Sequence, residues 1–182
     1  NNVFGDPEIE WSPTLNGGAG GFVYASIFVN AGVQGMCIHT SDPTGGTWTG
    51  PIPVTSTFIA GAAADKEFID VNQMTGRILM SWTNFPAGPA EIRTTFSTDN
   101  GATWSPSVVI GMDTGFVQSS MPSFRDGTND AYVVWRTIDA GGLRNVSCSR
   151  STDNGVTWSP QADLDSTDFA PEDFNPGNDR IN

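Results

Sequence analysis

Two carboxylates flank the only lysine of the chain, in the segment Asp65-Lys66-Glu67. A pair of carboxylic acids beside a cation can act as general acid and general base, because the surroundings set which of the two keeps its proton. Asp65 and Glu67 are therefore the candidate catalytic residues, and Lys66 is a candidate ligand-binding residue. The alternative is that these residues form the solvated end of a strand with a local ion pair.

Other reactive side chains are few. His39 is the only histidine, and its neighbours predict a place on a strand face rather than a metal-binding or catalytic role. Cys37 and Cys148 are expected at the same place in two repeats, as small core residues too far apart for a disulfide. The glycine-rich run 17–21 lacks the strand-before, helix-after context of a nucleotide-binding loop and is predicted to be a hairpin.

Acidic residues gather near the end of the sequence. Carboxylate oxygens at short spacing suit Ca²⁺, although the spacing here is not that of an EF-hand. The alternative is a solvated acidic connection. No other metal or cofactor is expected. The six residues are Asp163, Asp165, Asp168, Glu172, Asp173 and Asp179.

The composition favours a turn-rich all-β protein. The 182 residues include 21 glycines and 12 prolines, which leave little room for long helices. With 8 Lys+Arg against 20 Asp+Glu, the formal net charge is -12. Such a surface repels phosphate backbones, so nucleic acid is not an expected partner. No stretch reaches the ~20 apolar residues that cross a bilayer, so no membrane span is expected.

Two segments of the sequence are nearly identical, which indicates an internal repeat. They are STDNGATWSP at 97–106 and STDNGVTWSP at 151–160. A weaker third copy runs from Thr40 to Trp48, and it matches if one residue is inserted between its aspartate and its glycine. The tryptophans of the three copies then stand at 48, 104 and 158. We call each copy a box.

Each box predicts a tight hairpin. Its aspartate can accept hydrogen bonds from nearby backbone N–H groups, and its glycine tolerates a positive φ. The box residues are therefore predicted to be structural, since three sites on different repeats cannot converge on one substrate. They are Asp42, Ser97, Asp99, Gly101, Trp104, Ser151, Asp153, Gly155 and Trp158.

Four short β-rich segments accompany each box, which is the pattern of a propeller blade. The chain 1–182 is interpreted as one propeller region, with blade 1 at about 5–55, blade 2 at about 64–111, blade 3 at about 120–165, and 166–182 leading into an incomplete fourth blade. Trp82 with Trp135, and Trp104 with Trp158, recur in register and are expected in the cores between blades. The expected strands are 8–11, 22–28, 35–39 and 52–54; 66–71, 77–82, 91–96 and 107–110; and 122–124, 131–135, 145–150 and 162–164.

The box residues S-x-D-x-G-x-T-W resemble the Asp box, the bacterial neuraminidase repeat of the sialidase superfamily of six-bladed β-propellers. The segment 65–71 also resembles an inner strand of secreted, sialidase-like Asp-box proteins. The resemblance implies a secreted or cell-surface protein with a carbohydrate ligand. A chain of 182 residues holds three blades, so the remaining blades are expected either from the same longer chain or from a homo-oligomer.

The resemblance also implies which end of the propeller binds the ligand. In an up-and-down blade the boxes lie on one face, and sialidases bind substrate on the other face near the axis. This selects Asp65, Lys66 and Glu67 at the start of one inner strand. It also selects Arg136, Asp139 and Arg144 around a hairpin of blade 3 as ligand-binding residues.

A complete sialidase site is not visible in the sequence. Sialidases use three arginines, an aspartic acid, and a tyrosine paired with a glutamate as nucleophile. The Arg-Ile-Pro motif is absent, and Tyr24 and Tyr132 fall inside predicted strands, where packed aromatics are common. Two functions stay open: a sialidase-like module that recognises glycans, alone or within a glycoside hydrolase, and a non-catalytic structural or adhesion module.

Overall fold

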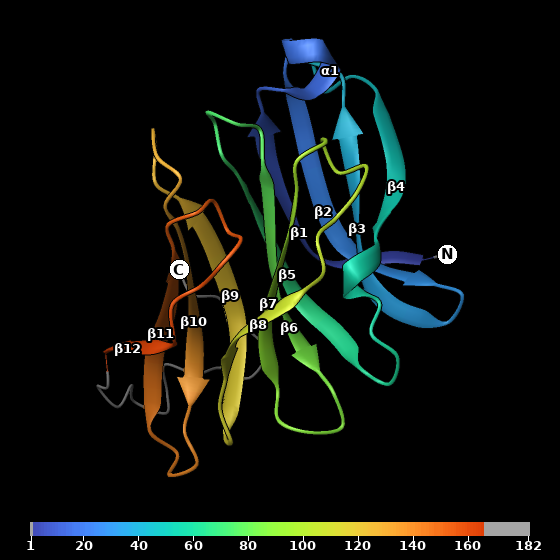
Figure 1. Cartoon of the computed structure of the whole chain (residues 1–182). Helices are drawn as coiled ribbons and strands as arrows, with labels where there is room; N and C mark the ends of the chain where they lie inside the picture. The colour runs from blue at the N-terminus through green and yellow to red at the C-terminus, as the bar shows by residue number, and fades with distance from the viewer. Residues whose placement is uncertain (1, 166–182) are drawn as a thin grey trace.

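The computed structural model describes residues 2–165 as three four-stranded antiparallel sheets in chain order (Figure 1). Each sheet is a simple meander, so the fold is the all-β propeller arrangement that the repeats predicted, with three blades. Blade 1 consists of β1 (Asn2–Ser12), β2 (Gly21–Asn30), β3 (Val33–Ser41) and β4 (Trp48–Val54). Blade 2 consists of β5 (Ala63–Val71), β6 (Ile78–Phe85), β7 (Glu91–Ser97) and β8 (Val108–Met112). Blade 3 consists of β9 (Phe116–Phe124), β10 (Ala131–Ile138), β11 (Arg144–Ser151) and β12 (Ala162–Asp165).

Each of the predicted strands overlaps an observed one, and the observed first strands are longer than predicted. The predicted connection 166–182 lies outside the described residues. The glycine-rich run lies in the loop of the β1–β2 hairpin, as predicted, and α1 (Leu15–Gly18) forms a single helical turn within that loop. Asn16 and Gly17 have φ of 54° and 69° there, a conformation that glycine and asparagine adopt at low cost. One 3-10 turn, η1 (Thr55–Thr57), follows β4.

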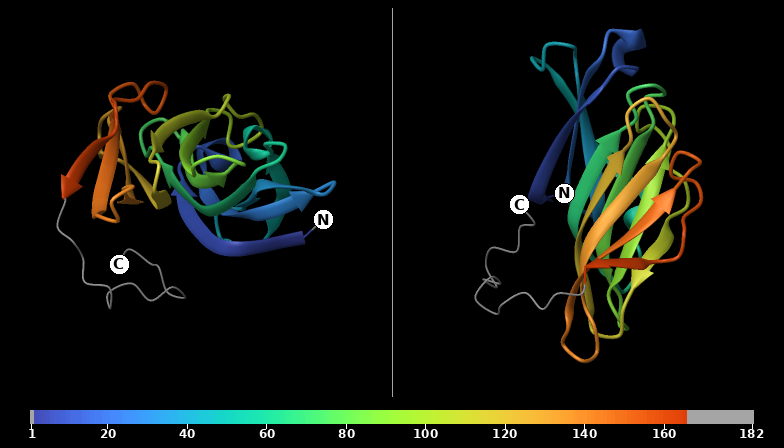
Figure 2. Two further views of the ribbon diagram at one scale, coloured as in Figure 1. Left: turned by 90° about the horizontal axis from the view of Figure 1, so that it is seen from below. Right: turned by 90° about the vertical axis from the view of Figure 1, so that its left-hand side faces the viewer.

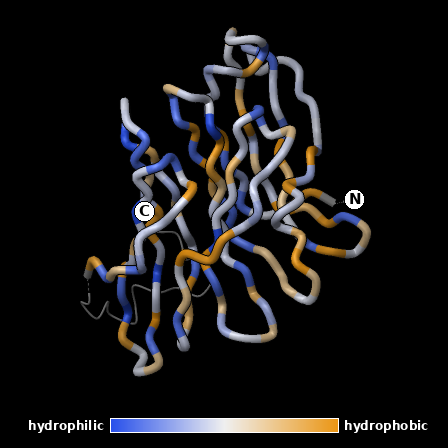
Figure 3. Tube along the Cα trace, in the orientation of Figure 1, coloured by the Kyte–Doolittle hydropathy of each residue, from blue (hydrophilic) through white to orange (hydrophobic). Residues whose placement is uncertain are grey.

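The first strand of each blade packs beside the first strand of the next. β5 contacts both β1 and β9, so these three strands form the inner layer, and β4, β8 and β12 form the outer edges. Figure 2 shows the blades following one another, from blade 1 in blue to blade 3 in orange. Apolar and polar segments interleave along the strands (Figure 3), as expected for sheets that alternate between two faces.

Hydrophobic cores fill the two spaces between the blades, as predicted. Trp82 and Trp135 are completely buried. Trp104 packs against the core between blades 1 and 2, and Trp158 packs against the core between blades 2 and 3. The blades therefore share their cores, which is how repeat units that cannot bury both faces alone become stable.

The boxes and the loops that follow each first strand lie at one end of the molecule, as predicted. Thr14 donates a hydrogen bond to Asn100 at 2.7 Å, and Asn72 donates one to Asn154 at 3.1 Å. Both bonds join the loop of one blade to the box of the next. In Figure 1 this end, which we call the box end, is uppermost. The β10–β11 hairpin lies at the opposite end, which we call the axial end. Among the described residues, no helix has the length and apolar character to span a membrane.

Candidate functional site

The box carboxylates accept hydrogen bonds from residues of their own hairpins. Asp99 accepts hydrogen bonds from the backbone N–H of Thr103 at 2.8 Å and from the Ser97 hydroxyl at 2.8 Å. The Gly101 N–H donates to Ser97 Oγ, and Trp104 Nε1 donates to the Gly101 carbonyl at 3.1 Å. The box of blade 3 repeats most of these bonds around Asp153. The box oxygens are therefore used in closing a loop.

Hydrogen bonds hold these carboxylates in the ionised form. The Thr157 hydroxyl and N–H lower the pKa of Asp153 to about 2. At Asp99 burial alone would raise the pKa, but bonds from Thr103 and Ser97 outweigh it and lower it. Bonds from the Thr47 and Thr44 hydroxyls likewise lower the pKa of Asp42.

The first box needs no inserted residue, which corrects the sequence alignment. Ser41 stands seven residues before Trp48, the same spacing as Ser97 to Trp104. Ser41 is buried at the end of β3, as Ser97 is at the end of β7. Asp42 therefore sits one position earlier than the other box aspartates, yet its Oδ2 still accepts the Thr47 N–H at 3.0 Å.

The new register also corrects the expectation for the cysteines. Cys37 pairs with Ser26 on one face of blade 1, whereas Cys148 pairs with Val134 on the opposite face of blade 3. The two residues are not equivalent, although both are free thiols as expected. Cys37 is buried and Cys148 is half-buried.

A β-bulge interrupts the inner strand of every blade at the same level. The regular pairing skips 5–7 in β1, 66–67 in β5 and 119–120 in β9. The first skipped residue has a positive φ each time: 108° at Gly5, 57° at Lys66 and 62° at Ser119. Bulges of this kind re-aim side chains and often lie beside functional sites. The predicted catalytic segment is thus one of three equivalent bulges near the axis.

The bulges of blades 1 and 2 meet through an ion pair. Lys66 Nζ donates to Asp6 Oδ2 at 2.6 Å. The bond to Asp6 raises the pKa of Lys66. Asp6 was missed by the sequence analysis, although Gly5-Asp6-Pro7 is a signal, because glycine and proline inside a strand usually mark a bulge.

Glu67 is the most perturbed carboxyl group of the site. Its side chain is completely buried, and neither oxygen makes a hydrogen bond of normal geometry. Burial is the main cause that raises its pKa to about 8; the nearby carboxylates of Asp6 and Asp65 contribute to this rise, whereas the N–H groups of Glu67 itself and Ile27 act in the opposite direction. Glu67 is therefore a neutral carboxylic acid at neutral pH.

The neighbouring blade explains why Glu67 lacks a partner. In blade 3 the equivalent bulge bonds to blade 2, since Ser120 Oγ donates to Ser81 at 3.0 Å and the Ser119 N–H donates to Thr83 at 3.3 Å. Blade 1 offers Ala25 and Ile27 at the register positions of Ser81 and Thr83. Apolar side chains there cannot hydrogen-bond a carboxyl group.

The other predicted residues lie at the axial end of blade 3. Arg136 is in β10, where its guanidinium is 5.5 Å from the centre of the Phe116 ring and 3.5 Å from Gln118 Oε1. Asp139 accepts hydrogen bonds from the Gly141 and Leu143 N–H groups and so closes the β10–β11 hairpin. Arg144 begins β11 and is half-buried. Asp65 begins the bulge in β5 and is half-buried too.

A second polar region lies at the box end. A cavity of about 420 Å³ is lined by the loops after β5 and β9, including Asp70, Arg125 and Asp126. Asp70 accepts the Phe124 N–H, while burial raises its pKa. Within residues 2–165, no three His, Cys, Asp or Glu side chains gather in a way that could hold a metal ion. The predicted acidic residues from Asp168 to Asp179 lie outside the described part.

Solved structures with similar folds can now be compared with this arrangement. A Dyadobacter fermentans protein of unknown function matches with a TM-score of 0.60 and 18% identity, over 87% of this chain and 50% of that chain. A Hadza microbial sialidase matches with a TM-score of 0.57 and 16% identity, over 76% and 34% respectively. An α-L-arabinofuranosidase from Fusarium graminearum, solved with an iminosugar inhibitor, matches with a TM-score of 0.60 and 14% identity, over 89% and 50%.

These similarities establish the fold. The chain has the β-propeller fold of sialidases and arabinofuranosidases, and it spans half or less of the length of these structures. No protein-family model matches the chain, and no curated protein matches its sequence.

Proposed function

We propose that the chain is a glycan-recognising, sialidase-like Asp-box module that acts at the axial end of the propeller, at the cell surface or after secretion. The observation that carries this proposal is the joined pair of bulges, in which buried, neutral Glu67 lies behind the Lys66–Asp6 ion pair. The sialidase and the arabinofuranosidase with the same fold support a sugar ligand.

The residues suit a glycosidase-like division of labour. Glycoside hydrolysis needs one carboxylic acid that keeps its proton and a second carboxylate. Glu67 has the raised pKa of the first, and Asp65, which directly precedes the bulge, is the second. We assign Lys66 to ligand binding, with Arg136, Asp139 and Arg144 as further ligand contacts at the same end.

Gly5 bears on whether Glu67 reaches a substrate. A Cβ at Gly5 would come 2.7 Å from the Ile27 side chain and 3.1 Å from Glu67 Oε1, so a glycine at this position leaves the room that the carboxyl group occupies. The Glu67 side chain is nevertheless fully buried in the structure. This burial favours the second candidate function, a non-catalytic structural or adhesion module.

Binding and turnover are tested separately. A glycan array measures binding, and fluorogenic sialosides and arabinofuranosides measure hydrolysis. Lys66→Met should weaken glycan binding at least about tenfold. Glu67→Gln should abolish hydrolysis while sparing binding, because it keeps the shape and removes the transferable proton. Ser120→Ala is the matched control, since Ser120 is equally buried in the equivalent bulge of blade 3.

The outcomes separate the hypotheses. Hydrolysis lost only in Glu67→Gln supports the enzyme, whereas binding without turnover supports the adhesion or recognition module. If no glycan binds and no glycoside is cleaved, the proposed function is wrong.

A further inference from the structure

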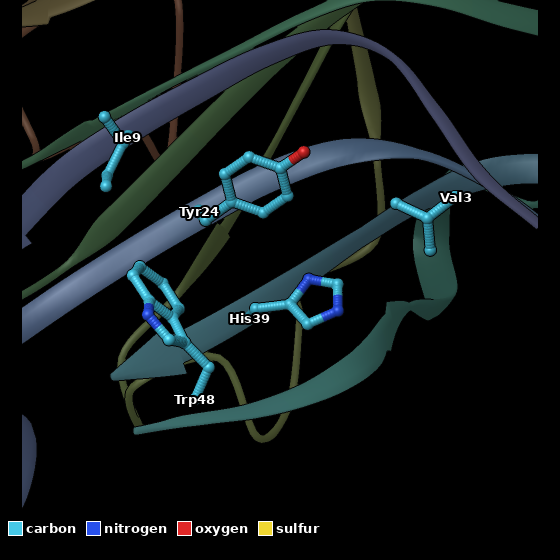
Figure 4. A pocket seen from close by; sticks show the side chains of 5 residues that line it. All are labelled: Val3, Ile9, Tyr24, His39 and Trp48. Atoms are coloured by element: carbon cyan, nitrogen blue, oxygen red, sulfur yellow. The ribbon is translucent and has the colours of Figure 1, made fainter. Parts of the chain in front are cut away.

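Blade 1 has an apolar depression on the face that points away from blade 2. It measures about 380 Å³ and is lined by Val3, Ile9, Tyr24, His39 and Trp48 (Figure 4). The Tyr24 ring contacts His39 and Trp48 edge-on, at centroid distances of 5.6 and 6.4 Å. Ile9 is 52% exposed and Trp48 is 44% exposed. Contiguous exposed apolar surface of this kind marks an interaction site.

In blade 2 the same register positions are covered by blade 1. Ile9 pairs with Tyr24 in blade 1, as Ile69 pairs with Met80 in blade 2. Ile69 and Met80 are buried because blade 1 packs on them. Trp48 likewise corresponds to Trp104, which is half-buried and packs against that core. The depression is therefore one half of an interface between blades.

Blade 3 presents the other half of such an interface. In β10, residues that face blade 2 alternate with Tyr132, Val134 and Arg136. These three residues are on the other face of the strand and are half-buried. The equivalent residues of blade 1 are Val23, Ala25 and Ile27, and all three are buried against blade 2. Nothing among residues 2–165 packs on this face of blade 3 as blade 2 packs on blade 1.

We propose that two copies of this chain associate head to tail, with blade 3 of each copy packed on blade 1 of the other. Closed propellers contain 4–8 blades. Residues 2–165 of one copy supply three blades, and those of two copies supply six, which lies within this range. Two identical contacts related by a twofold axis leave neither face uncovered.

Known contacts between the blades predict the new ones. Gln34 of blade 1 donates to the Ala64 carbonyl of blade 2 at 2.5 Å. Arg144 occupies the position of Gln34, since each lies seven residues before its box serine, and Val3 occupies that of Ala64. Arg144 should therefore donate to the Val3 carbonyl of the second copy.

Charge favours the same pairing. Arg136 occupies the position of Thr83, which accepts a bond from the bulge of the next blade. In the dimer it faces the bulge 5–7 of the second copy, which contains Asp6. Residues 1–65 contain no lysine or arginine, whereas Arg136, Arg144 and Arg150 alternate along the open face of blade 3. The second copy would thus bring a cation to the axial end of blade 1.

Sedimentation equilibrium tests this inference without any assay of the proposed function. The protein should have twice its monomer mass of 19.3 kDa. Ile9→Glu should raise the dimer dissociation constant at least about a hundredfold and Arg136→Glu at least about tenfold. Met74→Glu is the matched control, because Met74 is 55% exposed at the box end and its replacement should leave the dimer intact.

Mixing the variants tests the head-to-tail arrangement. Ile9→Glu and Arg136→Glu chains form a heterodimer that retains one native contact, so their mixture should contain more dimer than Ile9→Glu alone. A monomer at all concentrations would overturn the proposal, as would a dimer that is indifferent to Arg136→Glu. A monomer whose Trp48 fluorescence changes on adding a glycan would assign the depression to sugar binding instead.

Discussion

The boxes and the inner-strand bulges both occur three times, yet they use their carboxylates in opposite ways. Asp153 in a box is exposed, fully hydrogen-bonded and ionised. Glu67 in a bulge is buried, without a normal hydrogen bond, and neutral at pH 7. The box repeats its sequence, whereas the bulge repeats only its backbone. Repeated residues thus maintain this fold, whereas a repeated backbone with different residues leaves room for a site.

The largest expected effect concerns Glu67. Its pKa is raised from 4.5 to about 8 on folding, so the folded chain binds a proton that the unfolded chain releases. This contribution is fully present below pH 4.5 and is lost as the pH rises toward 8. The loss of this contribution between pH 5 and pH 8 should lower the free energy of unfolding by about 3 to 4 kcal/mol.

Denaturant unfolding at several pH values measures this slope. Glu67→Gln should flatten it, and Ala25→Ser should reduce it by giving Glu67 the hydroxyl partner that Ser120 finds in Ser81. Ser120→Ala should leave the slope unchanged. Parallel stability curves for the native chain and Glu67→Gln would show that Glu67 is ionised in the fold and would remove the contrast with the boxes.

A smaller effect tests how closely the box of blade 2 packs against blade 1. Gly101 has φ 87°, and a Cβ there would come 2.1 Å from Ile38 Cδ1. Gly101→Ala should therefore cost about 2 to 3 kcal/mol through backbone strain and overpacking. At Gly127 φ is 69° and nothing lies within 4 Å, so Gly127→Ala should cost only about 1 kcal/mol. Equal losses of unfolding free energy in the two variants would mean that the box is not closely packed against blade 1.

The same contrast explains what could be predicted from the sequence. The bonds of the box aspartates join residues four or five apart at most, such as Asp99 with Thr103 and Asp42 with Thr47, so residue types alone indicate the hairpin. A bulge depends on which residue of the neighbouring strand is skipped, and no local pattern records that. The partner of Lys66 is 60 residues away, and the isolation of Glu67 depends on Ala25 in another blade. The insertion expected in the first box was wrong for a related reason. Asp42 lies one position earlier than the other box aspartates, yet it bonds to the equivalent threonine of its own box.

The smallest expected effect is in the box itself. Asp153→Asn should lower the free energy of unfolding at pH 7 by about 1 kcal/mol, because it weakens hydrogen bonds that solvent already screens. The pKa of Asp153 falls from 3.8 to about 2 on folding, so its contribution is present above pH 4 and is lost as the pH falls toward 2. The native chain and Asp153→Asn should therefore converge in acid, where the Glu67 contribution is complete. Asp126→Asn, in an exposed loop, serves as the control and should show neither the loss nor the convergence. A loss for Asp153→Asn that persists unchanged at pH 2 would mean that the side-chain shape, and not its charge, closes the hairpin.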